Sequence, residues 1–256
     1  MHPLVTCGLC RACRFGDDVH CENSNFPGID CDGGYAEYLK TGARSVIKLD
    51  PSLEPADVAA LADAGLTAYH AVAKAARVLR PGNVVVMIGA GGLGHIGIQV
   101  MKAISAATIV VVDRNPAALA LAKELGADHT VQAGNDDAFV KEVLALTGDK
   151  GAEAVIDFVA EGGSTSTGVR MLRRAGNYYV VGYGENLNVP TIDVISTEIN
   201  FIGNLVGSYN DLAELMILAA QGKVVLHTTK YKLEDFQQAI DDLSAGKVRG
   251  RAILVP

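Results

Sequence analysis

A glycine-rich turn between an apolar run and an amphipathic stretch constrains the fold of this chain more than any other feature. The apolar run spans Val84 to Ile88, the turn spans Gly89 to Gly94, and the amphipathic stretch continues to Ile104. A second apolar run begins at Thr108 and ends in an acid, Asp113. This order predicts a strand, a tight turn, a helix packed on the strand, and a second, parallel strand.

The residues of the turn suit the requirements of a dinucleotide site. Gly89 permits a sharp turn off the strand, Gly91 lets the backbone approach a pyrophosphate, and Gly94 lets the helix lie close to the sheet. Gly92 and Leu93 complete the turn, and the free N–H groups and dipole of the helix N-terminus attract phosphates. A glycine-rich turn in an α/β domain without a nucleotide is the alternative. The strand, helix and acid in register favour the dinucleotide site.

The acid at the end of the second strand indicates which dinucleotide is bound. A carboxylate there accepts hydrogen bonds from the ribose hydroxyls of NAD, and it repels the 2′-phosphate of NADP. Asp113 therefore favours NAD, although the adjacent Arg114 could soften the discrimination. Both residues are candidates for cofactor binding.

Composition limits the class of protein. The chain has 256 residues, of which 49% are hydrophobic and 20% charged, so it can bury a large core in one or two domains. Its net charge of −7 offers no broad basic surface for nucleic acid. No apolar run is long enough to cross a bilayer, and the first residues carry no secretion signal. We therefore expect a cytoplasmic protein without a nucleic-acid or membrane partner.

Four cysteines near the start of the chain follow the pattern C-x2-C-x2-C-x7-C, namely Cys7, Cys10, Cys13 and Cys21. Four thiolates in a short polar loop suit a tetrahedral, closed, structural Zn²⁺ site. Disulfides are one alternative, which a reducing compartment disfavours. An iron–sulfur cluster is another, but the fourth cysteine lies too far along the chain and no proline follows it. The remaining cysteine, Cys31, is expected to be a single buried thiol.

After Asp113, strand and helix patterns continue to alternate. We expect strands at Asp128 to Gln132, Ala154 to Val159, Tyr178 to Val181 and Phe201 to Val206, and helices near Ala138 to Leu146 and Thr165 to Arg173. Asn115 is expected to cap a further helix that starts at Pro116 and ends before Gly126. With the two strands of the glycine-rich motif, the total is six. Six strands complete an α/β, doubly wound, parallel sheet.

The flanking segments have different patterns. Residues 33–49 alternate around Tyr35, Tyr38 and Val46, which predicts short strands of a β-rich lobe. A helical pattern then runs from Pro55 to Leu79. Toward the C-terminus we expect a helix at Leu212 to Ala220, a strand at Lys230 to Leu233, a helix at Glu234 to Ala245 and a strand at Ala252 to Val255.

Four features together resemble the zinc-containing medium-chain alcohol dehydrogenases, closest to the NAD-dependent branch that oxidises secondary alcohols. They are the cysteine lobe, the segment Asp63 to Thr67, the glycine-rich motif with Asp113, and the ending Gly246 to Arg251. The resemblance implies hydride transfer between NAD and a small alcohol or carbonyl compound, interconverting alcohols with ketones or aldehydes. It also implies that the zinc of the cysteine lobe is structural.

Further roles follow only from the resemblance. Backbone at Val181 and Gly182 matches a family contact to the nicotinamide half of the cofactor, and Arg251 matches an arginine that steadies the cofactor. Asp63 matches a ligand of the catalytic zinc, which in the family binds the alcohol oxygen. The implied domains are a partial catalytic domain with the zinc lobe at 1–64, a dinucleotide-binding domain at 65–207, and a return to the catalytic domain at 208–256.

The chain departs from the family pattern at its start. In the family, a cysteine, a histidine and a proton-relay hydroxyl of the catalytic site precede the cysteine lobe, whereas this chain begins almost at that lobe. We therefore expect a remnant of the catalytic domain, with a catalytic zinc in doubt.

Three functions remain open from the sequence. The chain is a zinc-type, NAD-dependent alcohol dehydrogenase, a truncated NAD-binding protein with structural zinc and little or no activity, or a reductase that uses NAD without a catalytic zinc. Because a missing portion would leave apolar surface uncovered, we expect a homodimer or homotetramer.

Overall fold

The computed structural model describes residues 1–248 and 250–256, so Arg249, in the C-terminal segment named above, lies outside the described residues. The chain divides into two compact units. One unit comprises Thr67–Leu205, and the other combines Met1–Leu66 with Val206–Pro256. In the described part of the chain, no helix has the length and apolar character of a membrane span.

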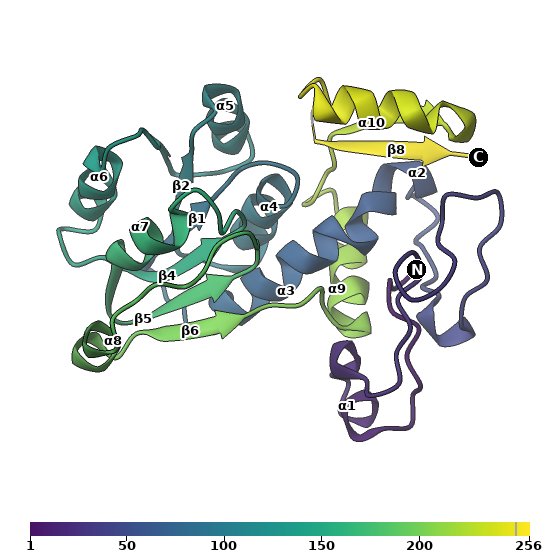
Figure 1. Ribbon diagram of the computed structural model, residues 1–256, viewed down its shortest axis with the longest axis horizontal. Coiled ribbons are helices and arrows are strands. Elements are labelled where there is room, and N and C mark those ends of the chain that lie inside the picture. Colours follow the sequence, from purple (N-terminus) through teal and green to yellow (C-terminus); the bar gives the residue numbers. More distant parts are fainter. Residues whose placement is uncertain (249) are drawn as a thin grey trace. The chain divides into compact units, whose positions relative to one another are not determined.

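The unit Thr67–Leu205 is built on a six-stranded parallel sheet (Figure 1). Its strands are β1 Val84–Ile88, β2 Thr108–Asp113, β3 His129–Gln132, β4 Ala152–Asp157, β5 Leu172–Val180 and β6 Asn200–Gly203. They lie in the order β3-β2-β1-β4-β5-β6, with every neighbouring pair parallel. This is the order of a doubly wound dinucleotide-binding fold, which confirms the predicted α/β class.

The register of the strands brings their carboxyl ends to one edge. Ile88 pairs with both Val112 and Asp157, and Asp157 in turn pairs with Val180. The residues that follow each strand therefore meet at that edge. In such a sheet, the crevice beside the first strand is where ligands bind.

Helices connect the strands and cover the sheet. They are α3 Ala64–Ala76, which starts in the other unit, α4 Gly94–Ile104, α5 Pro116–Glu124, α6 Ala138–Leu146, α7 Ser164–Arg170 and α8 Thr191–Thr197. Strand residues alternate between the two faces of the sheet. On one face, Val86 and Val110 share a core cluster with Val143 of α6, and on the other, Met87 lies against Gly97 of α4.

The predicted start of α5 is confirmed. The Asn115 side chain caps the helix by accepting a 2.9 Å hydrogen bond from the N–H of Ala117, and Gly126 follows the helix with a φ of 110°. Strand β5 begins earlier than predicted. Its first part was missed because it carries the exposed residues Arg173 and Arg174 and has no apolar pattern. Helix α8 was not predicted; it is short, with seven residues, and buries none of them.

The second unit contains short elements. They are α1 Arg11–Arg14, α2 Pro55–Val58, α9 Tyr209–Ala220, α10 Phe236–Ser244, and the parallel pair β7 Thr228–Lys232 and β8 Arg251–Val255, with 3₁₀ helices at Asp18–His20, Ala43–Ser45, Ala59–Ala62 and Leu233–Asp235. Helix α10 runs beside β8 (Figure 1). Buried polar groups tie its two chain segments together. Asp18 accepts a 3.0 Å hydrogen bond from the N–H of Tyr209, and His2 Nε2 lies 2.9 Å from the carbonyl oxygen of Gly207.

The prediction of short strands in residues 33–49 was wrong. The segment contains the 3₁₀ helix Ala43–Ser45 and no strand, and Tyr35, Tyr38 and Val46 are exposed. An alternating segment becomes a strand only when a neighbouring strand satisfies its backbone, and the described residues supply no such partner here.

The single helix predicted from Pro55 to Leu79 was also wrong in detail. The chain forms α2, a 3₁₀ turn and then α3, with a break at Asp63, where φ is −127° and ψ is −76°. The break lets Leu61 pack over the start of α3, where a Cβ on Gly65 would lie 2.7 Å from Leu61 Cδ2.

Candidate functional site

A cavity of about 770 Å³ lies at the carboxyl edge of the parallel sheet. Gly89 and Asp113 contribute to it from the ends of β1 and β2, and Ser164 contributes from the start of α7. Arg114 and Gly162 also line it. The cavity therefore occupies the crevice that this strand order predicts for a ligand.

Three of the four glycines of the turn differ in their surroundings. Gly89 has a φ of 90°, and a Cβ on Gly94 would overlap the carbonyl oxygen of Gly89. Gly91 has no positive φ, and a Cβ there would meet nothing within 4 Å. Gly89 and Gly94 are thus required by the turn itself, whereas Gly91 leaves open space beside the backbone. Open space at this position fits the close approach of a pyrophosphate.

Backbone amides hold Asp113 in place. One carboxylate oxygen accepts a 2.7 Å hydrogen bond from the N–H of Ala90, and the other accepts a 2.8 Å bond from the N–H of Asn115. A carboxylate has about four acceptor positions, so each oxygen can accept a further hydrogen bond from a ligand hydroxyl. Neighbouring Arg114 donates a 3.1 Å hydrogen bond to the carbonyl oxygen of Gly162, on the loop after β4.

Val181, Gly182 and Arg251, which are also proposed for cofactor binding, are not among the residues that line this cavity. Val181 and Gly182 follow β5. Both of their N–H groups donate to the carbonyl oxygen of Asp157, at 3.0 Å each. Arg251 begins β8 in the other unit, where its N–H donates to the carbonyl oxygen of His227 at 2.9 Å.

One wall of the cavity was not predicted from the sequence. This wall is the loop and first turn after β4, with Val159, Glu161, Gly162, Gly163 and Ser164 among its residues. The Gly-Gly-Ser sequence at the end of a predicted strand was the available signal. It resembles the phosphate-side turn at the end of β1, but it lacks the full glycine spacing.

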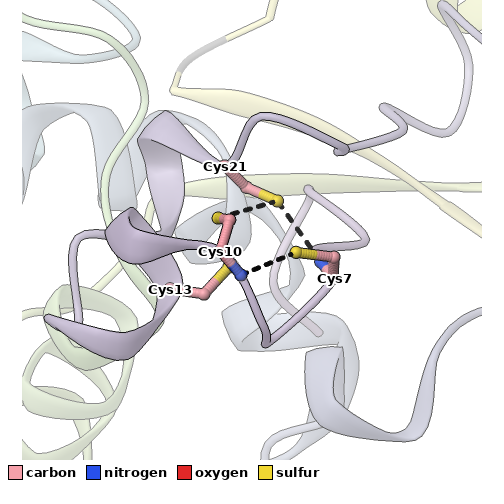
Figure 2. Close-up of side chains that lie close together, drawn as sticks. All are labelled: Cys7, Cys10, Cys13 and Cys21. Carbon is pink, nitrogen blue, oxygen red and sulfur yellow. Dashed lines mark hydrogen bonds between the residues drawn. The ribbon is translucent and has the colours of Figure 1, made fainter.

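The second candidate site is the cysteine cluster (Figure 2). The Sγ atoms of Cys7, Cys10, Cys13 and Cys21 all lie within 4.8 Å of one another, and the side chains point toward a common centre. In the described part of the chain, this is the single group of His, Cys, Asp or Glu side chains arranged for a metal ion. The donor set and spacing fit tetrahedral Zn²⁺ without an open position.

Backbone N–H groups point at these sulfur atoms. Leu9 and Cys10 donate to Cys7 Sγ at 3.4 and 3.3 Å, and these bonds lower the pKa of Cys7 to about 6. Burial raises the pKa of Cys13 to about 12. The two cysteines therefore do not both ionise near neutral pH by themselves. A bound divalent cation deprotonates a coordinating thiol, so zinc would bring all four to the thiolate form.

The expectation of a buried fifth thiol was wrong. Cys31 is exposed, and all five cysteines are free of disulfides. It lies in an irregular segment without a strand or helix to cover it.

Residues 1–248 and 250–256, which the structure describes, do not form a catalytic zinc site. Asp63 is exposed at the break before α3, and the described residues place no other ligands with it in a metal-binding group. His2 is buried and lies near the carbonyl oxygens of Leu4 and Gly207, and His20 contacts Asp17 at 2.9 Å. We therefore derive no chemical step through a catalytic metal.

Comparison with known proteins finds relatives along the whole chain. The family described as "Zinc-binding dehydrogenase" matches residues 92–221. An NAD-dependent alcohol dehydrogenase of Sulfurisphaera tokodaii is 40% identical over 100% of this chain and 74% of its own length.

Solved structures of dehydrogenases are also similar to this chain. The crystal structure of an alcohol dehydrogenase from Aeropyrum pernix matches with a TM-score of 0.94 and 47% identity, covering 100% of this chain and 75% of that one. A D-arabinose dehydrogenase from Sulfolobus solfataricus matches with a TM-score of 0.83 and 32% identity, over 91% of this chain and 72% of that one. The names of these two similar structures therefore give different substrates, an alcohol and D-arabinose.

We predict that the purified chain binds one zinc ion, held by the cysteine cluster. Cys10→Ser should abolish this zinc and lower the free energy of unfolding by about 3 kcal/mol or more, because metal-binding energy stabilises the folded lobe. Elemental analysis and urea unfolding measure the two effects. Cys31→Ser is the matched control and should keep its zinc. A Cys10→Ser protein with a full complement of zinc would contradict the assignment.

Alanine substitutions at two glycines should separate folding from cofactor binding. Gly94→Ala places a methyl against the backbone of Gly89 and should cost about 2 kcal/mol of stability. Gly91→Ala should cost less than about 0.5 kcal/mol, because its Cβ enters open space. The same methyl should weaken NAD⁺ binding by about tenfold or more, measured by calorimetry. Unchanged affinity in Gly91→Ala would show that the pyrophosphate lies elsewhere.

Proposed function

The chain belongs to the zinc-binding, medium-chain alcohol dehydrogenase family, and on that premise we propose that it is an NAD-dependent oxidoreductase acting on small alcohols. The favoured reaction interconverts a secondary alcohol and a ketone, with aldehydes as the other carbonyl class. The name of the Sulfurisphaera tokodaii relative includes NAD dependence, which supports the choice of cofactor.

The observation that carries this proposal is the Asp113 carboxylate, held by two backbone amides at the edge of the crevice. A fixed carboxylate needs little reorganisation to accept the two hydroxyls of a ribose. It also places a negative charge where NADP carries its 2′-phosphate. Asp136 lines the same cavity and adds to the negative potential, whereas the charge of Asp137 is paired with Arg170 at 2.6 Å.

Bound NAD⁺ supplies the hydride acceptor for this reaction. We assign the binding and orientation of the cofactor to the protein. Asp113 and Arg114 would fix the adenosine ribose, the turn from Gly89 to Gly94 would receive the pyrophosphate, and the backbone at Val181 and Gly182 would contact the nicotinamide half. Arg251 would steady the bound cofactor. The zinc of the cysteine cluster would hold its lobe together and take no part in the reaction.

A second candidate function is NAD binding with structural zinc and little or no turnover. It is favoured because Asp63 belongs to no group of metal-binding side chains in the described part of the chain, and a single carboxylate does not make a catalytic zinc site. We therefore treat Asp63 as a zinc ligand that would need further metal ligands, which the described residues do not supply.

A four-thiolate site also suits a reducing compartment, so we propose a cytoplasmic location.

We expect the chain to reduce NAD⁺ with propan-2-ol as the substrate. The reaction is monitored by the absorbance of NADH at about 340 nm, with protein whose metal content has been measured. Asp63→Asn should lower turnover if Asp63 helps to hold a second metal, and Cys31→Ser should leave it unchanged. NAD⁺ binding with one zinc and no turnover would favour the second function. Absence of NAD⁺ binding would contradict both.

Replacement of Asp113 should alter cofactor choice. Asp113→Asn removes the charge and one acceptor oxygen, so NAD⁺ affinity should fall by roughly tenfold while NADP⁺ affinity stays level or rises. Asp128→Asn is the control. Asp128 also accepts a backbone hydrogen bond, from Ile109 at 2.8 Å, but it lies near the start of β2, away from the crevice. Equal losses of NAD⁺ and NADP⁺ affinity in Asp113→Asn would contradict the ribose role.

We propose a homodimer, or a tetramer built from dimers, in which the β6 side of the sheet is covered. Strand β6 is an edge strand, and α8, which precedes it, exposes 66% of Ile192 and 71% of Ile195. Exposed apolar side chains beside an unpaired strand favour association. In sedimentation at micromolar concentration, the double replacement Ile192→Asp and Ile195→Asp should convert the oligomer to a monomer. A monomeric wild-type chain would contradict the proposal.

A further inference from the structure

Asp157, at the end of β4, is a fully buried carboxylate with no role in the assignments above. It has an exposed fraction of 0%. One oxygen accepts hydrogen bonds from the N–H groups of Val159 and Ala160, both at 2.9 Å. The other accepts from the hydroxyls of Ser164, at 2.8 Å, and Tyr178, at 2.6 Å. These four donors occupy its acceptor positions, so Asp157 acts on its surroundings and does not bind a ligand itself.

The groups that Asp157 holds form one wall of the cofactor crevice. Val159 and Ser164 line the cavity. Between them, Ala160 is 2% exposed and has a φ of 49°, a conformation that a side chain makes unfavourable. The hydrogen bond from its N–H to Asp157 offsets this strain. The shape of the loop after β4 therefore depends on this one carboxylate.

The main chain of Asp157 also holds the segment after β5. Its carbonyl oxygen accepts from the N–H groups of Val181 and Gly182. A Cβ on Gly182 would overlap the backbone of Val159, so the two segments are in close backbone contact. One residue thus joins the loop after β4 to the segment after β5.

A second carboxylate closes the same connection. Glu185 accepts hydrogen bonds from the N–H groups of Gly163 and Thr165, both at 2.8 Å, and its own N–H donates to the carbonyl oxygen of Ala160 at 2.9 Å. Burial raises the pKa of Glu185, but the bonds from Thr165 and Gly163 outweigh it and lower the pKa overall. Burial and the charge of Asp157 raise the pKa of Tyr178, so its hydroxyl stays a donor.

We propose that Asp157 is the positioning residue that sets the separation of the loop after β4 and the segment after β5, and thereby the fit of the cofactor beyond its adenosine ribose. The proposal rests on the proposed binding of NAD. It assigns Asp157 no contact with the cofactor and no part in discriminating NAD from NADP, which belongs to Asp113 on the other side of the crevice.

Two substitutions at Asp157 distinguish geometry from charge. Asp157→Ala removes all four hydrogen bonds of the side chain. Asp157→Asn can keep them, because its carbonyl oxygen can still accept from the two backbone N–H groups, and its NH₂ can donate to the Ser164 and Tyr178 hydroxyls, which also accept. Asn should therefore restore the function that Ala loses.

The probes are NAD⁺ and AMP, titrated by calorimetry into the full chain. In Asp157→Ala, NAD⁺ affinity should fall by about tenfold or more, whereas AMP affinity, which depends on the Asp113 side, should change by less than about twofold. Asp157→Asn should return NAD⁺ affinity to near the wild-type value. Glu153→Gln is the control, because Glu153 holds the N–H of Val84 at 2.7 Å at the opposite edge of the sheet. It should lower stability without changing either affinity.

The outcomes separate this proposal from the proposed function. Equal losses of AMP and NAD⁺ affinity in Asp157→Ala would show a general structural role and overturn the proposal, as would an Asn variant as weak as Ala. If the wild-type chain binds neither probe, the proposed function fails and the positioning role fails with it. If Asp157→Ala does not fold, Tyr178→Phe replaces it. Tyr178→Phe should weaken NAD⁺ binding by about threefold and leave AMP affinity unchanged. An NAD⁺ affinity equal to that of the wild-type chain would overturn the proposal.

Discussion

The parallel register of β1, β2, β4 and β5 is the constraint on which the site depends. It makes four strands end at one edge, so that a turn, a carboxylate and two loops from distant parts of the sequence meet there. Strands β1, β2 and β4 are almost wholly buried, and a shift of register by one residue would send each side chain to the wrong face. Burial of the sheet core therefore fixes the position of the crevice. The identity of the residues that follow each strand is not constrained by this packing.

Backbone amides and buried carboxylates then refine this edge. Asp113 is held by the amides of Ala90 and Asn115, and Asp157 holds the amides of Val159 and Ala160. Both follow the same physical rule, since a carboxylate that accepts backbone N–H groups fixes the chain around it. The first is exposed enough to meet a ligand, and the second is buried and supports the wall. The cysteine lobe has few regular elements, and a Zn²⁺ ion held by its four thiolates would supply the cross-link that a small core does not.

The sequence predicted the parts of the structure that have strong local signals. The apolar strands, the glycine turn and the Asn115 cap were recoverable because periodicity and turn chemistry determine them locally. The strands predicted around Tyr35 and Tyr38 do not form, because a strand needs a neighbouring strand as its partner and no local pattern reveals whether one is present. The exposure of Cys31 was likewise a tertiary property that no local pattern reveals. The role of Asp157 could not be predicted, because its partner Tyr178 lies on another strand and only the sheet order brings the two together.

A crystal structure of the chain with NAD⁺ would show where the cofactor lies. We expect both hydroxyls of the adenosine ribose within hydrogen-bond distance of the Asp113 carboxylate, and the pyrophosphate beside the backbone of Gly91. We also expect the loop after β4 to keep its hydrogen bonds to Asp157. A cofactor bound elsewhere, or an Asp113 carboxylate without contact to the ribose, would contradict this expectation.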